Sequence, residues 1–316
     1  MTARIFIDGA AGTTGLEIRE RLSGRSELSV TALGEAERKD AGARKAALNA
    51  ADVVILCLPD DAAREAVSLI DNPHTRVIDA STAHRVADGW TFGFAELSPD
   101  GYARIAAARR VSNPGCWATG FLALARPLVS GGLVPADFPL TVHGVSGYSG
   151  GGKSMIEEFE KKDSAIFVET VQRGYALGLG HKHLPEMMRH AGLTHPPLFS
   201  PAVARFYRGM LVELPLQLWA LPGKPKLRDL HAALTAAYPN RPLVEVASLE
   251  EAASLKSIDA ELLSGSNRMK LFVFGDDKAG QARLVAALDN LGKGAGGAAV
   301  QNLNLMLGLS ETTGLL

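Results

Sequence analysis

A cysteine directly follows a proline and a glycine in SNPGCWATG, which runs from Ser112 to Gly120. The apolar spacing from Trp117 to Leu128 predicts a helix, so Cys116 is expected at or near a helix N-terminus. The positive end of a helix dipole stabilises a thiolate, which lowers the thiol pKa and activates the sulfur. A cysteine that merely packs as a small apolar residue is the alternative. The position favours a nucleophile.

Two histidines, His181 and His183, stand two residues apart in GHKHLPE, ahead of a proline. If this segment is extended, both side chains point to the same side and share one pocket. A histidine beside a thiol supplies the general acid or base that thiol chemistry needs. Solvent-facing structural histidines are one alternative. A metal pair is another, but no further Cys/His cluster is near in the sequence, so we predict no metal site.

A glycine-rich stretch, DGAAGTTG, follows the opening apolar run and leads into a helical pattern. Glycines there permit a tight turn and close backbone approach, and the helix N-terminus favours a pyrophosphate. The spacing is G-x-x-G-x-x-G rather than G-x-G-x-x-G, but the strand, turn and helix context predicts a dinucleotide site. The residues expected to bind the cofactor there are Gly9, Gly12, Thr13, Thr14 and Gly15.

The choice of dinucleotide depends on the residues that follow the second apolar run. Glu35 stands where an acidic residue would bind a ribose hydroxyl of NAD. Arg38 and Lys39 follow it, and a cation there accommodates the 2′-phosphate of NADP. These residues alone leave the choice open, and Arg38 is the candidate for the 2′-phosphate.

A nicotinamide site, a thiolate and a histidine together define a narrow chemistry. The thiolate attacks an acyl group to give a thioester, or an aldehyde to give a thiohemiacetal, and hydride passes between that carbon and the nicotinamide. The sequence therefore predicts an enzyme that interconverts an activated acid and an aldehyde.

A second glycine-rich loop, GYSGGGKS from Gly147 to Ser154, matches the P-loop pattern at every position. A P-loop NTPase would need this loop to open the nucleotide domain, yet it lies in the middle of the chain. Asp276 or Asp289 would then be its Walker-B aspartate. We expect instead that backbone without side chains approaches the nicotinamide ring and that a lysine holds an anionic substrate or is solvated. These residues are Gly150, Gly151 and Lys153.

The elements that position these residues fall into two groups. In the first third of the chain, short apolar runs alternate with helical patterns, which predicts βαβ units around a parallel sheet. The expected strands are 4–7, 28–33, 52–58 and 76–79, and the expected helices are 14–22, 36–48 and 61–70. From about residue 139, long apolar or alternating stretches predict a mixed or antiparallel sheet. They are 140–145, 197–206, 210–221, 269–274 and 283–288.

Composition limits the partners and the location. The formal net charge is −1, so no basic field is available for nucleic acid or anionic lipid, and a small molecule is the expected partner. The longest apolar run, 53–58, is far short of the ~20 residues of a membrane span. With no signal-peptide pattern and only two cysteines, we expect a cytoplasmic protein. Cys57, inside VVILCLP, is expected to pack in the core on a central strand.

Several of these segments resemble the N-acetyl-gamma-glutamyl-phosphate reductases, in their shorter type-2 branch. The resemblance also covers VIDASTAHR at 77–85 and the tail AVQNLNLMLGL, and its most specific parts are SNPGC, HxHxPE and QNxNLMxG. It implies reduction of N-acetylglutamyl 5-phosphate to the 5-semialdehyde with NADPH, a step of arginine biosynthesis. Another acyl-phosphate or semialdehyde reductase, of the aspartate-semialdehyde type, is the close alternative. A Rossmann-type binding protein without catalysis is a more distant one.

The resemblance implies an α/β protein with a Rossmann-type NADP-binding domain over 1–115 and an α+β catalytic domain over 116–295. The second domain would have a mixed or antiparallel sheet, like those of glyceraldehyde-phosphate and aspartate-semialdehyde dehydrogenases. A final helix over 296–316 would return to the first domain. A homo-oligomer, either a dimer or a tetramer, is expected.

The same resemblance assigns roles to single residues. Cys116 becomes the nucleophile, with the acid/base in the histidine pair. Arg85 would bind the leaving phosphate or the substrate carboxylate, although His84 stands where phenylalanine is commoner. Asn113 could donate to the oxyanion or stabilise the turn. Asn302 could contact the nicotinamide amide or satisfy a buried polar group.

Overall fold

Two units divide the chain in the computed structural model, which describes residues 2–315. Unit 1 comprises the described residues of Met1–Ala95, Asp100–Gly115 and Ala295–Leu316. Unit 2 comprises Glu96–Pro99 and Cys116–Gly294. Each unit is built around its own β-sheet. The C-terminal segment, from Ala295 on, belongs to the same unit as the N-terminal sheet.

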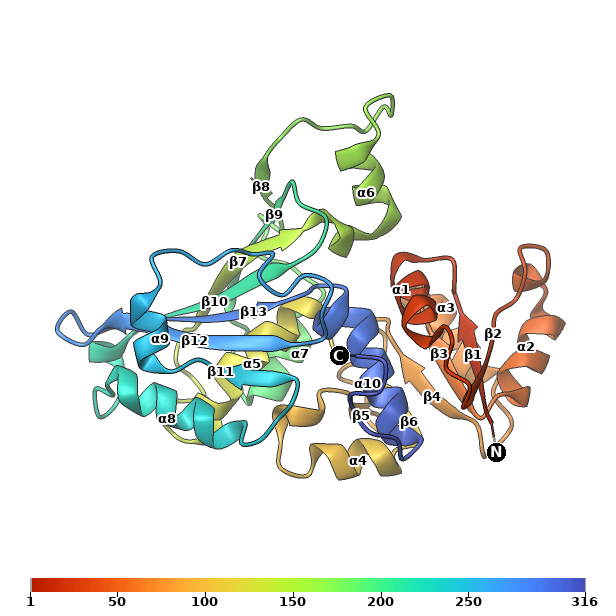
Figure 1. Cartoon of the computed structure of the whole chain (residues 1–316), viewed down its shortest axis with the longest axis horizontal. Helices are drawn as coiled ribbons and strands as arrows, with labels where there is room; N and C mark the ends of the chain where they lie inside the picture. The colour runs from red at the N-terminus through yellow and green to blue at the C-terminus, as the bar shows by residue number, and fades with distance from the viewer. Residues whose placement is uncertain (1, 316) are drawn as a thin grey trace. The chain divides into compact units, whose positions relative to one another are not determined.

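The sheet of unit 1 has the strand order β2-β1-β3-β4-β6-β5, and every neighbouring pair is parallel (Figure 1). This confirms the predicted parallel α/β sheet. The chain runs from β1 outward to β2 and then crosses to β3 on the other side of β1. The carboxyl ends of β1 and β3 therefore form the switch point at which open α/β sheets bind ligands. The strands are β1 Ala3–Asp8, β2 Leu28–Thr31, β3 Val53–Leu56, β4 Arg76–Asp79, β5 Thr91–Phe92 and β6 Arg110–Ser112.

The helices of unit 1 follow the predicted pattern with shifted ends. The helix expected from residue 36 begins at Ala41 instead, because the Asp40 side chain accepts a hydrogen bond from the Ala43 N–H at 2.6 Å and caps it there. The helices are α1 Thr13–Leu22, α2 Ala41–Ala50, α3 Asp60–Ser68, α4 Gly101–Ala107 and α10 Gly297–Met306, with a 3-10 turn η1 Glu37–Lys39. A further 3-10 turn, η2 Ala95–Leu97, begins in unit 1 and continues into the Glu96–Pro99 segment of unit 2.

The C-terminal helix is shorter than the sequence predicted. α10 ends at Met306, and Gly308 follows with a φ of +71°. The N–H of Leu309 donates to the Asn304 carbonyl at 2.8 Å, which is the closing hydrogen bond of a glycine-capped helix end. The helix predicted over 296–316 therefore ends some ten residues early, because a left-handed glycine stops it.

The sheet of unit 2 is mixed, as predicted, with the order β11-β12-β13-β10-β7-β9-β8. The pairs β7–β9 and β11–β12 are parallel, and the other pairs are antiparallel. The stretch expected at 210–221 is shorter, because a 3-10 turn, η4 Leu218–Ala220, follows β10. The strands are β7 Thr141–Gly147, β8 Gln172–Gly174, β9 Leu198–Ala204, β10 Met210–Gln217, β11 Val244–Val246, β12 Met269–Asp276 and β13 Gln281–Leu288.

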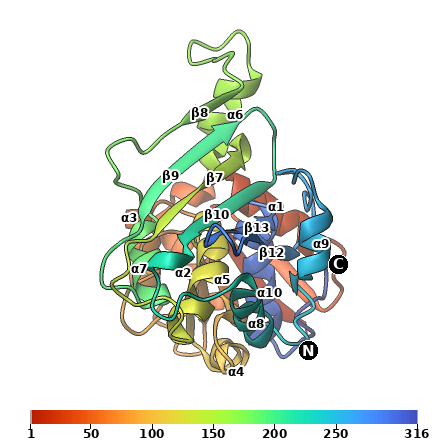
Figure 2. The same ribbon diagram turned by 90° about the vertical axis from the view of Figure 1, so that its left-hand side faces the viewer.

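Helix α5 packs closely on this sheet, and α8 lies on the same face (Figure 2). A methyl group at Gly120 of α5 would come within 2.5 Å of Val212 on β10, so the helix approaches at a distance that only glycine allows. The helices of unit 2 are α5 Cys116–Ser130, α6 Gly152–Glu160, α7 Leu184–Ala191, α8 Leu227–Ala237 and α9 Leu249–Ser254, with a 3-10 turn η3 Tyr148–Gly151 and a π-helical turn η5 Gly292–Gly296. No helix within residues 2–315 has the length and apolarity to cross a membrane.

Cys57 was expected on a central strand over 52–58 but lies one residue beyond the observed strand β3. β3 ends at Leu56, and the Cys57 N–H donates to the Asp8 carbonyl at 2.8 Å. The side chain is half-buried rather than fully enclosed. Burial, followed by the charges of Asp79 and Asp8, raises the pKa of the Cys57 thiol to about 12. The thiol is therefore protonated at neutral pH and unsuited to nucleophilic attack.

Candidate active site

Helix α5 begins at Cys116, as the sequence predicted, and the cysteine side chain is half-buried. The residue that follows it, Trp117, is buried and anchors the first turn of the helix. A thiol on the first residue of a 15-residue helix lies at the positive end of its dipole. Unit 2 thus presents the partly accessible sulfur of Cys116 at a position where the helix dipole stabilises a thiolate.

Asn113, three residues before the cysteine, is almost fully buried and engages all its polar groups. Its N–H donates to the Asp79 carbonyl at 2.7 Å, and its side-chain amide donates to the Ala295 carbonyl at 2.9 Å. Its carbonyl accepts from Arg85 and its side-chain oxygen from Asn302. These contacts favour the turn-stabilising alternative for Asn113.

Arg85 and Asn302 serve the same turn in unit 1. Arg85 is 8% exposed and donates to the carbonyls of Asn113 at 3.0 Å and Ala80 at 3.3 Å. The Asn302 amide donates to the Gly93 carbonyl and to Asn113, while its own oxygen is buried without a hydrogen-bond partner among the described residues. Arg85 therefore holds backbone in this structure, and Asn302 retains one unused acceptor.

The two histidines do not lie on an extended segment, which was the condition under which their spacing would direct both side chains to one side. His183 has helical φ and ψ of −89° and −10°, and it caps the start of α7. The rings still meet, with centroids 4.7 Å apart at 87°, because the His183 N–H donates to Nδ1 of His181 at 3.1 Å and closes a tight turn. A neutral His181 then carries its proton on Nε2.

An aromatic cluster joins this histidine turn to the start of α5. The Trp117 indole donates to the Tyr175 hydroxyl at 2.8 Å, and the Tyr175 and His181 rings lie 5.9 Å apart. Phe199 packs edge-on against both Trp117 and His181. Burial raises the pKa of Tyr175, and the charge of Cys116 raises it further. The sequence carried no signal for Tyr175.

Glu186 is a second residue that sequence reasoning missed. It lies on the first turn of α7, is 1% exposed, and places Oε1 4.0 Å from Nε2 of His183. A buried carboxylate at this distance stabilises a protonated imidazole. His183 and Glu186 are three residues apart in HLPE, and side chains at that spacing meet on one face of a helix. Interpreting this segment as a helix start would therefore have identified Glu186.

The first glycine loop fits a dinucleotide phosphate. Gly9 has a φ of +86°, and a methyl group there would come 2.3 Å from the Cys57 carbonyl oxygen, so the loop lies at the switch point beside β3. α1 starts after Gly12 without any side-chain cap, which leaves its first N–H groups directed outward. The Thr13 hydroxyl has no hydrogen-bond partner among the described residues. These unsatisfied donors suit a pyrophosphate.

Glu35 and Arg38, the two candidates for binding the adenosine ribose of the dinucleotide, form an ion pair with each other. Arg38 Nη2 and Glu35 Oε1 lie 2.8 Å apart, and both side chains are well exposed. Arg44, which sequence analysis did not single out, lies on α2 and pairs at 3.0 Å with Asp8, the residue before Gly9. Arg38 and the neighbouring Lys39 are thus exposed cations in this loop, and Arg44 is committed to the end of β1.

The P-loop-like segment does have a strand, a turn and a helix around it, and the backbone N–H groups of its first three residues are hydrogen-bonded within unit 2. The N–H groups of residues 147, 148 and 149 donate to the carbonyls of Gly209, Phe206 and Tyr207 at 2.9 to 3.0 Å. The first three residues of the segment are therefore held by the turn that precedes β10. Lys153 is exposed on α6.

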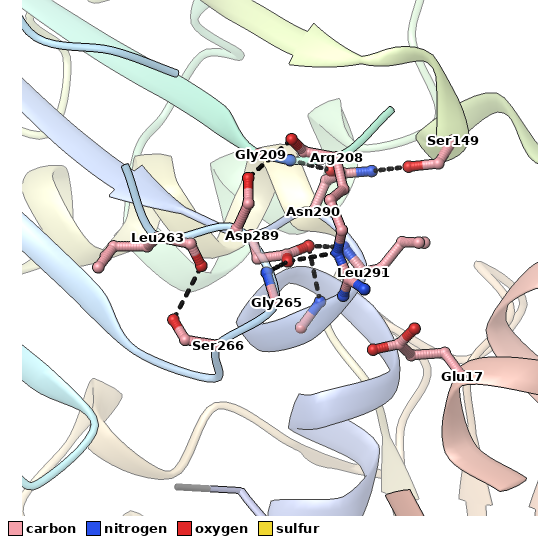
Figure 3. A network of polar contacts seen from close by, with 12 residues as sticks. Glu17, Ser149, Arg208, Gly209, Leu263, Gly265, Ser266, Asp289, Asn290 and Leu291 are labelled. Atoms are coloured by element: carbon pink, nitrogen blue, oxygen red, sulfur yellow. Dashed lines mark hydrogen bonds and ion pairs between the residues drawn. The ribbon is translucent and has the colours of Figure 1, made fainter. Parts of the chain in front are cut away.

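The proposed Walker-B aspartates serve other contacts. Asp289 is fully buried and accepts from Nε of Arg208 at 2.6 Å and from the N–H groups of Leu291 and Gly292 (Figure 3). Asp276 is exposed and accepts from the Lys278 N–H at 2.7 Å. Asp289 is therefore a structural hub for the residues that follow β13.

Comparison with known proteins identifies both units. Residues 4–105 match the family model for the semialdehyde dehydrogenase NAD binding domain, and residues 116–290 match the one for the semialdehyde dehydrogenase dimerisation domain. In fold the chain is similar to aspartate semialdehyde dehydrogenase II of Vibrio cholerae complexed with ASA. The TM-score is 0.70 at 14% identity, over 97% of this chain and 98% of that one. A Candida albicans aspartate semialdehyde dehydrogenase with NADP has a TM-score of 0.65 at 14% identity, over 97% and 99%. The protein is thus a semialdehyde dehydrogenase in class.

A curated relative narrows this class. The chain is 54% identical over 309 residues to the N-acetyl-gamma-glutamyl-phosphate reductase of Brucella ovis, covering 98% of this chain and 100% of the relative. The chain belongs to the N-acetyl-gamma-glutamyl-phosphate reductase family, and it is an oxidoreductase. Membership excludes both the P-loop NTPase and the non-catalytic binding protein.

Proposed function

We propose that this enzyme reduces N-acetylglutamyl 5-phosphate to the 5-semialdehyde and phosphate, as a step of arginine biosynthesis, through a thioester on Cys116. The name and the 54% identity of the Brucella relative support the substrate. The observation that carries the mechanism is the half-buried Cys116 at the first residue of α5, joined to His181 through Trp117 and Tyr175. An aspartyl phosphate reductase is the alternative substrate assignment.

We propose that residues 1–115 with the C-terminal helix bind NADP and that residues 116–295 form the catalytic domain. Gly9, Gly12, Thr13, Thr14 and Gly15 would hold the pyrophosphate, supported by the glycine-only turn and the uncapped start of α1. When bound, the nicotinamide supplies the hydride. The similar Candida albicans structure carries NADP, which supports NADPH over NADH.

Other proposed cofactor contacts follow from exposure and unused polar atoms. The exposed Arg38 would pair with the 2′-phosphate in place of Glu35. The unused Asn302 oxygen suits an amide donor such as the nicotinamide carboxamide. Gly150 and Gly151 are exposed and lack side chains, so their backbone is proposed to border the ring.

The covalent steps are assigned to unit 2. The Cys116 thiolate attacks the acyl carbon, its sulfur–carbon bond forms, and the carbon–oxygen bond to phosphate breaks. The Cys116 N–H at the start of α5 would stabilise the negative oxygen, while Asn113, whose amide donates to the Ala295 carbonyl, would hold the turn before it. After reduction of the thioester carbon, a proton reaches that oxygen from the histidine pair and later returns, as the aldehyde leaves and the thiolate re-forms.

The two imidazoles divide the proton work in this proposal. His181 has Nδ1 engaged by the His183 N–H, so its Nε2 is the atom that transfers a proton. His183 lies beside the buried Glu186, which would stabilise its charged form. We therefore assign acid/base transfer to His181, with His183 as its charged neighbour.

The phosphate and carboxylate groups of the substrate would be bound by cationic side chains. Arg85 and Lys153 are the proposed ligands for the phosphate or the carboxylate. Lys153 is exposed on α6, which suits a mobile substrate contact. Arg85 is supported by its place at the turn before Cys116, although its guanidinium also holds two carbonyls.

We further propose a homo-oligomer, a dimer or tetramer, in the cytoplasm. The match of unit 2 to a dimerisation domain supports the assembly. The absence of any disulfide between Cys57 and Cys116 is compatible with a reducing compartment.

Phosphate-dependent oxidation of the semialdehyde tests the substrate assignment. The purified enzyme is given N-acetylglutamate 5-semialdehyde or aspartate semialdehyde, each with NADP or NAD. We expect reduction of NADP only with the acetylated substrate and only when phosphate is present. Equal or faster turnover of aspartate semialdehyde would contradict the proposal.

A further inference from the structure

Lys293 and Glu96 form a buried ion pair. Lys293 precedes Gly294, the glycine that packs against Cys116. Lys293 Nζ and Glu96 Oε1 lie 2.7 Å apart, and neither side chain exposes more than 2% of its surface. Removing two charges from water costs nearly as much as their attraction returns, so a buried pair is weak evidence of a stabilising role. The role of this pair therefore follows from the segment that contains Lys293.

Lys293 belongs to the π-helical turn η5, whose sequence is GKGAG. Glycines give a turn no side chains with which to pack and more conformational freedom than any other residue. A methyl group at Gly294 would come 2.7 Å from Cβ and 3.2 Å from Cα of Cys116. The backbone of this glycine-rich turn is therefore the surface against which Cys116 packs.

Asp289 anchors the start of this turn. Its carboxylate accepts from the Leu291 N–H at 2.8 Å (Figure 3) and from the Gly292 N–H at 3.1 Å. Its carbonyl accepts from the Gly294 N–H at 2.9 Å. The Lys293 side chain reaches in turn to Glu96, so the turn has a second anchor in its middle.

The other end of the pair acts electrostatically on a tyrosine that is bonded to helix α5. Burial raises the pKa of Tyr238, and the charge of Glu96 raises it further. The Tyr238 hydroxyl donates to the Ala123 carbonyl of α5 at 2.8 Å. The ion pair therefore fastens η5, whose Gly294 contacts Cys116, to the turn that contains Glu96.

We propose that Lys293 and Glu96 are positioning residues for Cys116. Their ion pair holds η5 in one place relative to α5 and so fixes the direction in which the sulfur attacks. Neither residue takes part in bond formation. The inference rests on the proposed nucleophilic role of Cys116.

A neutral double variant, Lys293→Met with Glu96→Leu, tests positioning without leaving a buried charge. We expect it to keep its thermal midpoint within a few degrees, because well-packed apolar residues can replace a buried pair. We expect kcat to fall by about tenfold or more with KM within about twofold, since small displacements of reacting groups cost large factors in rate. The matched control is Lys270→Met with Glu245→Leu, a 2.7 Å pair between β12 and β11, which should keep the wild-type kcat.

Thiol alkylation gives a readout that does not need the proposed substrate. Iodoacetamide modification of Cys116 is followed between pH 6 and 9 in the wild type and in both double variants. The Lys293/Glu96 variant should change the rate constant at a given pH by about threefold or more, because orientation and local charge govern thiolate reactivity. If the wild type does not turn over the substrate, the function proposal fails while this comparison still stands.

A folded Lys293/Glu96 variant with the wild-type kcat and alkylation profile would overturn the proposal. If that variant does not fold, Glu96→Gln supplies the test, because the amide keeps the size and the acceptor oxygen but loses the charge. A wild-type kcat and alkylation profile in Glu96→Gln would overturn it equally. A lowered kcat with unchanged KM and an altered alkylation profile supports it.

Discussion

The Tyr238 hydroxyl donates a hydrogen bond to the Ala123 carbonyl, 2.8 Å away in the interior of α5. That carbonyl would ordinarily accept from residue 127, which is a proline and has no N–H. Tyrosine thus replaces the hydrogen bond that the proline removes from the helix carrying Cys116. We expect Tyr238→Phe to lower the free energy of unfolding by about 1–3 kcal/mol, the cost of an unsatisfied buried carbonyl. Urea unfolding measures it, and a change below 0.5 kcal/mol would argue against this role for the tyrosine.

Replacing Cys116 with serine should abolish turnover. A hydroxyl at the start of α5 keeps the local packing but is a far weaker nucleophile than a thiolate at neutral pH. NADPH affinity, measured by fluorescence titration, should stay close to wild type, which shows that the protein remains folded. Retention of a near-wild-type rate would exclude a thioester on Cys116.

The two histidines should respond differently to alanine. His181→Ala should lower kcat by roughly 10² to 10⁴, the usual contribution of positioned proton transfer. His183→Ala removes the neighbour of Glu186 and the ring packed on His181, so we expect a smaller fall in kcat. Steady-state kinetics of both variants decide the assignment; a larger effect at His183 would reverse it.

Arg38 should carry most of the preference for NADPH. Its guanidinium is exposed and pairs with Glu35, so a 2′-phosphate competes with that carboxylate. Arg38→Ala should weaken NADPH binding about 10- to 100-fold, the worth of a charge-assisted hydrogen bond, and leave NADH binding unchanged. Glu35→Gln is the companion variant and should tighten NADPH. Calorimetric titration with both nucleotides measures this, and full selectivity in Arg38→Ala would remove Arg38 from the site.

Only one of the two cysteines should react with iodoacetamide at pH 8. The pKa of Cys57 is raised to about 12, so roughly one molecule in 10⁴ carries its thiolate at that pH. Reactivity at Cys57 should appear only as the pH rises toward that value. Peptide mass mapping after brief alkylation checks this, with Cys116→Ser as the control that should take up almost no label. Prompt labelling of Cys57 would contradict the effect of its burial and of Asp79 and Asp8.

The sequence by itself determined the features that depend on neighbouring residues. Alternating apolar runs predicted the parallel sheet of unit 1, and the longer runs after residue 139 predicted the mixed sheet of unit 2. Proline and glycine before an apolar helix predicted that α5 begins at Cys116. Strand and helix periodicity and helix-end signals are local, so one chain is enough to show them.

Tertiary structure decided what depends on contacts between distant segments. The histidine segment is a helix start rather than a strand, because α7 begins directly after His183 and Glu186 lies on its first turn. Tyr175 and Lys293 have no sequence signal, since the first acquires its role from Trp117 and the second from Glu96. The backbone of the P-loop-like segment bonds to residues 206–209, some 60 positions away. A local pattern does not encode which far residue uses a given N–H or charge, because folding alone brings those partners together.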